Sequence, residues 1–449
     1  LAQFAIRWRW WVLLAALILT ATIGASARHL EFANNYRTFF SEENPELTAF
    51  EELQTTYTKN DNFLFVLVPG KDNVFSVDTL SAVEDLTAGA WKIPHAIRVD
   101  SITNFQHSYA IGDELVVEDL IRDAASLDAA SRDARARIAL DEPLLLGQLV
   151  TPDRRATAVN VVLQYPEQSL NEVPDAVTAA RTLRAQIKSE HPDMEVYLTG
   201  VSMLNNAFME AGMSDMGTLV PAMFAFILIL TLFVLRSVGA TVATAVVIML
   251  STMVAMGAAG LMGVKLTPIS GSAPIVILTL AIADSIHILI SLRKVVGEGR
   301  GRVEAITEAL RLNFMPVSIT SLTTIIGFLA LNFSDSPPFW HLGNITALGI
   351  GAAWLFSITI LPALMSMFPI RAASATTRSR RLPSMNDLAS FVIARPRTLL
   401  LTLGVASTLL ISFVPSLQLN DQWTRYFDQR IEFRGDTDQA LQHFGMYPI

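Results

Sequence analysis

The chain has 449 residues, a formal net charge of −8, a hydrophobic fraction of 51% and a charged fraction of only 16%. With a mean hydropathy of +0.41, this composition is typical of a membrane protein with a soluble part attached, and its acidity argues against a nucleic-acid partner. Cysteine is absent, which excludes a disulfide framework, a thiolate metal site and a cysteine nucleophile.

Both ends of the sequence predict that it is a fragment of a longer protein. It starts at Leu1 instead of methionine, and residues 442–449 lie inside an amphipathic stretch with no terminating signal. Near the start, Arg7 and Arg9 precede an apolar run that continues to about residue 27 without a clear cleavage site. We therefore expect a retained membrane anchor and not a removable signal peptide.

Seven apolar runs are long enough to cross a bilayer. They lie at 10–27, 217–235, 238–262, 267–292, 314–333, 342–368 and 397–415. Basic residues cluster before the first run and after the second, fourth and sixth runs, whereas the opposite short loops hold only Lys265 and Asp335. Because basic loops stay in the cytoplasm, this pattern predicts a multi-pass protein with a cytoplasmic amino terminus and a large outer domain. The resemblance given below implies that the membrane is the bacterial inner membrane and that the outer domain is periplasmic.

The runs divide the chain into six expected segments. These are a first span at 1–27, a periplasmic domain at 28–215, spans two to six at 216–368, a cytoplasmic linker at 369–396, a seventh span at 397–415 and the truncated start of a second periplasmic domain at 416–449. Residues 28–215 hold 15 basic and 30 acidic residues, which favours a solvated surface over an acid-lined substrate groove.

Within residues 28–215 the pattern indicates an α+β fold. Expected strands lie at 63–68, 97–102, 156–164 and 195–198, and expected helices at 76–91 and 172–190. This order gives strand–helix–strand twice, which is compatible with split βαβ units of the ferredoxin type. The charged insert at 114–141 is expected to form a solvated pair of helices.

An internal repeat links the two ends of the chain at an offset of 387 residues. Residues 28–40 read RHLEFANNYRTFF and residues 415–427 read PSLQLNDQWTRYF, and each copy follows an apolar run that is preceded by arginine. We therefore expect the seventh span to open a second copy of the six-span unit. The complete protein would then have about twelve spans and two outer domains, since repeated halves are a common transporter plan.

Asp284 is the only acidic residue inside any of the predicted spans. It lies nine residues before Arg293, which places it about 13 Å from the cytoplasmic boundary and close to the midplane of a core about 30 Å thick. A carboxylate at that depth is costly unless it is neutralised or solvated, and intramembrane acids commonly act in proton relays. The alternative is a residue that only locks helices together through hydrogen bonds.

Polar residues near Asp284 are candidates for sharing its proton. His287 follows one turn along the same helix, so an Asp–His pair could pass a proton, and Ser285 adds a hydroxyl group. Further hydroxyl candidates stand on the fifth span: Thr320, Ser321 and Thr324. The alternatives are polar packing for His287 and, for the hydroxyl groups, hydrogen bonds to the preceding helical turn.

No metal-ligand spacing, phosphate-binding loop or nucleophile–base pair stands out in the sequence. We therefore expect no metal site, no cofactor and no catalytic residue. Without a Walker-type loop, ATP is not the expected energy source. These features favour a secondary active transporter over an enzyme.

Several stretches carry a resemblance to a known superfamily. Residues 281–287, AIADSIH, are similar to the acidic motif of RND-superfamily exporters, and residues 320–338 resemble their fifth span and the loop after it. Residues 101–120 resemble the same exporter group, in which the lipid-exporting MMPL branch is the most similar. Spans two to six are also similar to the sterol-sensing domains of Patched and Niemann–Pick type C proteins. Many MMPL members have Asp-Tyr where this chain has Asp284-Ser285.

The resemblance implies an α-helical membrane protein built on an RND-type six-span repeat, with an α+β extracytoplasmic domain of ferredoxin-like βαβ porter subdomains. It implies proton-driven export of lipids or other hydrophobic molecules, with Asp284 as the proton-carrying acid. Expected partners are protons, a lipid or hydrophobic small molecule and membrane lipids, and a homo-oligomer or a periplasmic partner stays open. The alternatives are a non-transporting sterol or lipid sensor and an accessory to protein export.

Overall fold

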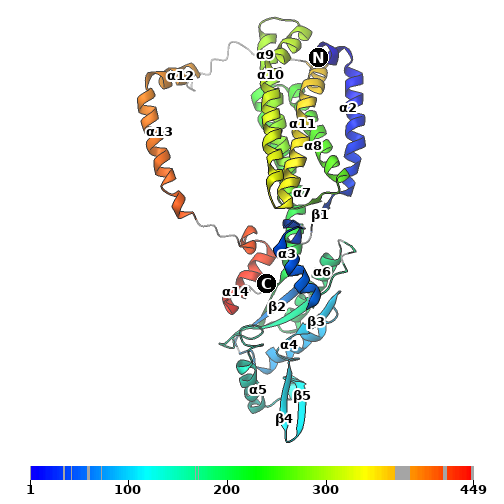
Figure 1. Ribbon diagram of the computed structural model, residues 1–449, viewed down its shortest axis with the longest axis vertical. Coiled ribbons are helices and arrows are strands. Elements are labelled where there is room, and N and C mark those ends of the chain that lie inside the picture. Colours follow the sequence, from blue (N-terminus) through cyan, green and yellow to red (C-terminus); the bar gives the residue numbers. More distant parts are fainter. Residues whose placement is uncertain are drawn as a thin grey trace.

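The computed structural model describes residues 2–33, 36–41, 43–57, 61–71, 73–166, 168–169, 171–369, 385–417 and 422–445. Its long helices form a bundle, and an α+β domain extends from one end of that bundle (Figure 1). The segments predicted as a linker at 369–396 and as the start of a second domain at 416–449 lie partly outside the described residues.

Within the described residues, seven helical segments are long and apolar enough to cross a membrane, as many as the sequence predicts. The helices are α2 (Arg9–Gly24), α7 (Val201–Leu235), α8 (Val238–Leu261), α9 (Ala273–Gly297), α10 (Arg302–Leu329), α11 (Pro337–Met365) and α13 (Pro396–Ile411). α7 is longer than the predicted second span because it begins directly after the last strand of the sheet and runs without a break into the bundle. The expected domain boundary at 215/216 therefore falls inside one continuous helix.

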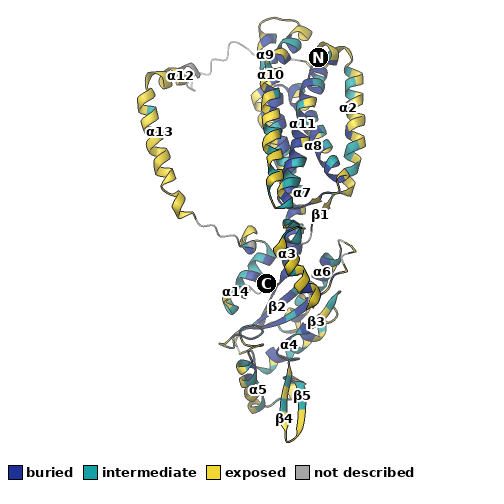
Figure 2. Cartoon of the chain, in the orientation of Figure 1, coloured by how far each residue is buried: buried dark blue, intermediate teal, exposed yellow. Residues whose placement is uncertain are grey.

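Small residues bring the helices of the bundle close together. A Cβ atom added to Gly257 or Gly260 of α8 would collide with the carbonyl oxygens of Ile23 and Ser26, so α2 can lie against α8 only because these positions are glycine. α13 instead stands apart from the bundle and exposes its apolar side chains along its length (Figure 2).

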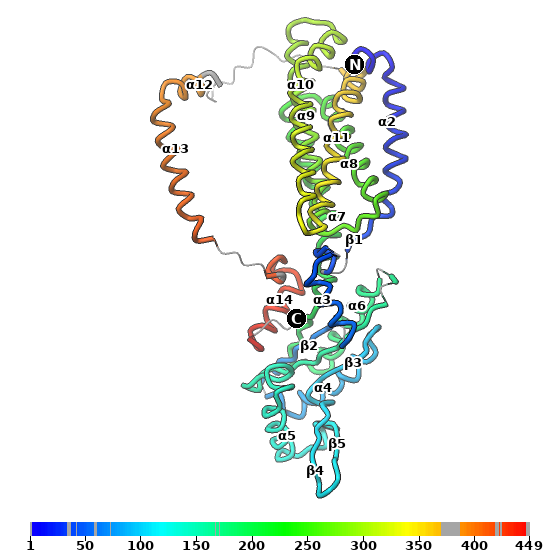
Figure 3. Tube along the Cα trace, viewed as in Figure 1, coloured from blue at the N-terminus to red at the C-terminus, as the bar shows by residue number. Residues whose placement is uncertain are grey.

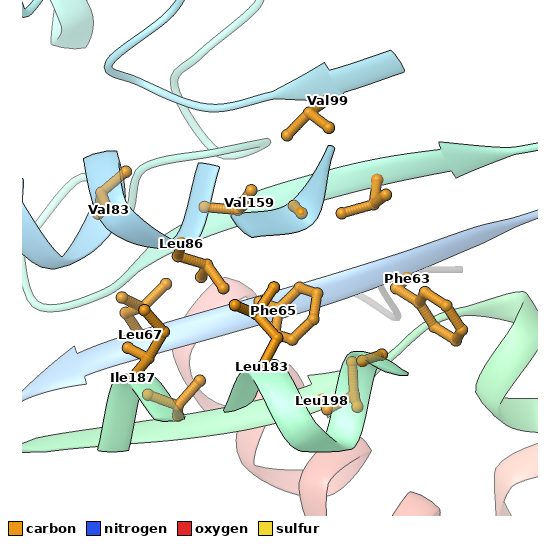
Figure 4. Packing of buried hydrophobic residues seen from close by; sticks show 14 of the residues in the cluster. Phe63, Phe65, Leu67, Val83, Leu86, Val99, Val159, Leu183, Ile187 and Leu198 are labelled. Atoms are coloured by element: carbon orange, nitrogen blue, oxygen red, sulfur yellow. The ribbon is translucent and has the colours of Figure 1, made fainter. Parts of the chain in front are cut away.

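A four-stranded antiparallel sheet forms the α+β domain, in the order β3–β6–β2–β7. The strands are β2 (Asn62–Pro69), β3 (Ala96–Asp100), β6 (Thr157–Leu163) and β7 (Met194–Thr199), and the main helices are α4 (Val77–Ala90) and α6 (Glu172–Glu190). In chain order the elements form two successive strand–helix–strand units, β2–α4–β3 and β6–α6–β7, as the sequence predicts, and the strand order of the sheet interleaves the two units. Both helices cover one sheet face, where Phe65 and Leu67 pack with Leu86 and Leu183 (Figure 4).

The insert at 114–141 does not form a pair of helices, so that prediction is wrong. β4 (Gln106–Ile111) and β5 (Glu114–Asp119) form an antiparallel hairpin, and only α5 (Ala129–Asp141) is α-helical in this segment. The two-residue turn places Gly112 at a φ of +60°, a conformation that favours glycine and closes hairpins. The apolar and β-branched residues 115–117 favour a strand. The helical prediction gave more weight to the charged residues on either side of them.

The structure repeats three elements at the same offset of 387 residues as the sequence. α2 and α13 begin at residues 9 and 396, the 3-10 turns η2 (Tyr36–Phe39) and η7 (Trp423–Tyr426) at 36 and 423, and the helices α3 (Pro45–Thr56) and α14 (Glu432–Phe444) at 45 and 432. α14 lies beside the sheet of the α+β domain (Figure 3). Its Ala440 packs with Leu64 and Val66, which β2 directs away from α4 and α6.

Shorter elements complete the described chain. They are α1 (Ala2–Arg7), η1 (Ala25–His29), β1 (Glu31–Phe32), η3 (Ala124–Ser126), β8 (Lys265–Leu266), η4 (Ser270–Ser272), η5 (Ala330–Phe333), α12 (Met385–Ala394) and η6 (Val414–Ser416). β1 pairs in parallel with β8, which ties the exit of α2 to the connection between α8 and α9.

Candidate functional site

Asp284 lies near the middle of α9, about 17 Å from the start of this helix and about 20 Å from its end at 1.5 Å per residue. Only 6% of the residue is exposed, so its carboxylate is inside the bundle. The helix can place it there because the residues around it are apolar, with Ala281 and Ile288 buried on neighbouring turns. Pro274 stands in the first turn of α9, where its missing N–H group costs no hydrogen bond.

One hydroxyl group holds this carboxylate. Ser321 Oγ of α10 donates a hydrogen bond of 2.9 Å to Asp284 Oδ2, and Ser321 is itself buried. α10 packs along α9, so the bond joins two helices inside the bundle (Figure 3). The ion pairs formed by described residues of α10 involve Arg300 and Arg311 and not Asp284. A buried anion without a counter-ion is destabilising, and binding a proton removes that cost.

Several buried hydroxyl groups of the bundle have no hydrogen-bond partner within the described part of the chain. Among them are Ser285, next to Asp284 on α9, and Thr346 and Ser357 on α11, which packs against α9. Buried hydroxyl groups are normally paired, with water where no protein group is within reach. The sequence reasoning missed Thr346 and Ser357, although a polar residue within an apolar span is a signal that could have found them.

The other candidates named from the sequence lie elsewhere. His287 is one turn from Asp284, but its side chain is on the exposed side of α9. Thr320 Oγ1 donates to Pro316 O at 2.9 Å, and Thr324 Oγ1 donates to Thr320 O at 2.7 Å. Both threonine hydroxyls thus bond to the preceding turn of α10, and Ser321 is the fifth-span candidate that reaches Asp284.

α7 connects the surroundings of Asp284 with the α+β domain. This helix starts after β7, continues through the bundle and packs against α9. On the domain side, Arg181 of α6 donates two hydrogen bonds, of 2.7 and 3.1 Å, to the carboxylate of Glu210 on α7. A displacement of α9 can therefore be transmitted to the sheet through one continuous helix.

One group of possible metal ligands occurs within the residues that the structure describes, far from Asp284 in the fold. It consists of Asp85, Glu190 and His191 at the surface of the α+β domain. His191 Nε2 lies 3.3 Å from Asp85 Oδ2, and the two carboxylates are exposed. Solvated acidic groups of this kind are common without an ion, so this cluster defines no metal centre.

The long apolar helices and the carboxylate buried among them define a multi-pass membrane protein. The family follows from comparison with known proteins, because the model of the MMPL family matches residues 46–399. The chain belongs to the MMPL family.

Two curated proteins are similar to the chain. It is 23% identical over 289 residues to the mycolic acid-containing lipids exporter MmpL11 of Mycolicibacterium smegmatis, a match that covers 60% of this chain and 30% of that protein. It is 23% identical over 367 residues to the membrane protein MJ1562 of Methanocaldococcus jannaschii, which covers 79% of this chain and 89% of that protein. The chain thus matches less than a third of the length of the first relative and most of the second.

Proposed function

We propose that the full-length protein uses the proton gradient across the bacterial inner membrane to export lipids or other hydrophobic molecules. Asp284 is the proton-carrying group in this proposal. The observation that carries it is the carboxylate buried at the middle of α9 with one neutral hydroxyl, that of Ser321, as its hydrogen-bond donor. A group that is costly to keep charged can bind and release a proton as its surroundings change.

Buried hydroxyl groups on α9 and α11 are proposed as part of the route for the proton. Ser285, Thr346 and Ser357 offer buried hydroxyl groups without a partner in the described chain, where water molecules can bind. Chains of hydroxyl groups and water carry protons between buried carboxylates and solvent. His287, on the exposed side of α9, is proposed as the next group in this relay.

Proton binding must favour one conformation over another if it is to drive transport. Neutralising Asp284 changes the force that holds α9 and α10 together, because the Ser321 hydrogen bond loses its charged acceptor. α7 packs against α9 and extends into the α+β domain, so it supplies the mechanical link between the proton site and that domain. In this proposal the domain lies in the periplasm and its interleaved βαβ units act as a porter that passes substrate onward.

The proposed substrate class rests on the family and on one relative. The M. smegmatis relative is named as an exporter of mycolic acid-containing lipids, and the MMPL model covers most of this chain. A lipid substrate also suits a protein whose candidate proton site lies among membrane-spanning helices, because such a substrate enters from the bilayer. We therefore propose lipids as the first substrates to test.

The test uses the full-length protein in liposomes with an imposed proton gradient. Proton release is followed while candidate lipids are added, for the wild type, for Asp284→Asn and for Thr323→Ala. Thr323 lies two residues from Ser321, and its hydroxyl donates to the backbone of its own helix, so this variant is a matched control. We expect lipid-dependent proton flux in the wild type and the control, and a loss of about a hundredfold or more in Asp284→Asn.

Two outcomes would contradict the proposal. Equal flux in the wild type and Asp284→Asn would remove Asp284 from the proton path. Lipid binding without any proton flux in the wild type would indicate a lipid sensor in place of a transporter.

A further inference from the structure

The helix α3 exposes a row of large apolar side chains. Leu53 is 53% exposed and Tyr57 is 78% exposed, and Phe50 lies on the same side of the helix and is partly exposed. Figure 2 shows α3 largely in the colour of exposed residues. This row is separate from the candidate proton site, and nothing in the described chain covers it.

The helix at the same place in the second repeat is covered. α14 begins 387 residues after α3, and its Phe433, Thr437 and Ala440 are buried against the α+β domain. Thr437 Oγ1 lies 2.7 Å from Thr199 Oγ1 of β7, and Phe444 packs beside Ala440 at the end of the helix. The buried face of α14 therefore runs through positions 433, 437, 440 and 444.

The two rows coincide when the helices are aligned by the repeat. Positions 437, 440 and 444 of α14 correspond to Phe50, Leu53 and Tyr57, whereas Phe433 corresponds to the exposed Glu46. The preceding aromatic residues follow the same rule, since Phe427 is buried against Phe208 whereas its counterpart Phe40 is 38% exposed. The first copy thus exposes apolar side chains at three of the four helix positions that face the domain in the second copy.

We infer that α3 docks on a second α+β domain of the same kind, in the way that α14 docks on the first. That second domain is the one the repeat predicts after α14 in the full-length protein, so the two halves exchange equivalent helices. Another copy of this chain does not fit as the partner, because its own α14 already occupies the matching sheet face. The repeat is present in sequence and in structure, and α14 of the second half packs on the domain of the first half. We therefore expect α3 of the first half to pack on the domain of the second half.

The docking contacts of α14 and those inferred for α3 differ in chemistry. α14 is held partly by charge, because Glu432 pairs with Arg181 at 2.8 Å and Asp436 pairs with Arg184 at 2.9 Å. The residues of α3 that correspond to these two acids are proline and alanine, at 45 and 49. The docking of α3 is therefore apolar, and burying Leu53 and Tyr57 is its main source of free energy.

The experiment places a photo-crosslinking residue, p-benzoylphenylalanine, at position 53 of the full-length protein and identifies the adducts by mass spectrometry. We expect adducts within the same polypeptide, on residues after 445 that correspond to β2 or β7. The matched control carries the crosslinker at Thr55, which is exposed on the opposite side of α3 and bonds to its own helix. We expect at least about a fivefold lower adduct yield at that position, because a helix presents only one face to a partner.

The packing of α14 against β7 is tested in the same full-length protein. Residues 1–449 contain no cysteine, so Thr199→Cys together with Thr437→Cys adds the only thiols of this segment, and we expect them to form a disulfide. Adducts at twice the monomer mass, adducts on lipid, or equal yields at 53 and 55 would overturn the inference. If no disulfide forms between positions 199 and 437, the inference is overturned as well, because it is based on the packing of α14 against the sheet.

Discussion

The helical bundle contains a buried aspartate, Asp284, the α+β domain contains a partly buried one, Asp436, and the two carboxylates are compensated in different ways. In the domain, Asp436 of α14 accepts a hydrogen bond of 2.9 Å from Arg184 and one of 3.0 Å from the Leu198 N–H group. In the bundle, Asp284 accepts a hydrogen bond of 2.9 Å from the neutral hydroxyl of Ser321. Asp436 thus has a cation as a hydrogen-bond donor, whereas the hydrogen-bond donor found for Asp284 among the described residues is a hydroxyl group.

In the proposed function, this difference separates a structural role for Asp436 from a proton-carrying role for Asp284. Burial raises the pKa of Asp436, but the adjacent Arg184 favours its charged form, and removing one partner leaves the other uncompensated. An aspartate with a hydroxyl partner has no such counter-charge, so its charge state can change without leaving a buried cation alone. The predictions below test this contrast, in order of decreasing expected effect.

Replacing Asp284 by asparagine has the largest expected effect on function. Proton-coupled transport falls about a hundredfold or more, which corresponds to about 2.7 kcal/mol or more in the driving step. Stability changes by less than about 1 kcal/mol, because a neutral amide of the same shape still accepts the Ser321 hydrogen bond. Flux measurements in liposomes and thermal unfolding of the same preparation check the two parts. A strongly destabilised variant would contradict the account by making Asp284 a structural residue.

Replacing Asp436 by alanine should show the reverse pattern. We expect the docking of α14 to weaken by about 1–3 kcal/mol, because Arg184 and the Leu198 N–H group lose an acceptor in a partly buried site. Hydrogen exchange of the α14 amides measures this weakening. Arg184 keeps Glu432 as a partner, which limits the loss. If Asp436→Ala reduced proton coupling as strongly as Asp284→Asn does, the two aspartates would not differ in role and the account would be contradicted.

Replacing Ser321 by alanine should produce an intermediate effect on transport. The variant removes the hydrogen bond between α10 and Asp284, worth about 1–2 kcal/mol, and we expect a loss of about fivefold to thirtyfold in proton-coupled flux. Ser321→Thr keeps the hydroxyl group and should restore most of the flux. The pH profile of transport is recorded for both variants. If the threonine and alanine variants behave alike, the hydroxyl group has no positioning role.

Salt should have the smallest effect and should act on one region only. Raising the ionic strength screens partly exposed ion pairs, so the docking of α14 through Arg181 and Glu432 weakens by less than about 1 kcal/mol. Asp284 is inside the bundle and its hydrogen bond is little screened. We expect faster hydrogen exchange in α14 at high salt and unchanged proton coupling, measured at equal proton gradients. Equal salt sensitivity in both regions would contradict the assignment.

Much of the fold could be predicted from sequence because its patterns are local. The apolar runs gave seven spans, and the predicted helix at 172–190 coincides with α6. The hairpin at 106–119 was missed because its charged flanks resemble a helical insert, although the glycine at its turn carried the signal. The continuity of α7 across the expected domain boundary was also missed, since a helix can leave the bilayer without any change in its backbone.

The candidate site could be predicted only in part. Asp284 stood out because an acid within an apolar span is rare. Which fifth-span hydroxyl reaches it depends on the rotation of α10 about its axis, and sequence spacing alone placed Thr320 and Thr324 on one helical face with Ser321 beside that face. The buried hydroxyl groups of α11 depend on packing between helices, which no local pattern records.

The most direct test of the central claim is an infrared spectrum of the full-length protein recorded across a pH titration. A protonated carboxyl group in an apolar site gives a carbonyl band of its own, and the comparison is between wild type, Asp284→Asn and Thr323→Ala. The account predicts a band that titrates in the wild type and the control and is missing from Asp284→Asn. A titrating band that survives in Asp284→Asn, or no titrating band in the wild type, would contradict the claim that Asp284 exchanges a proton.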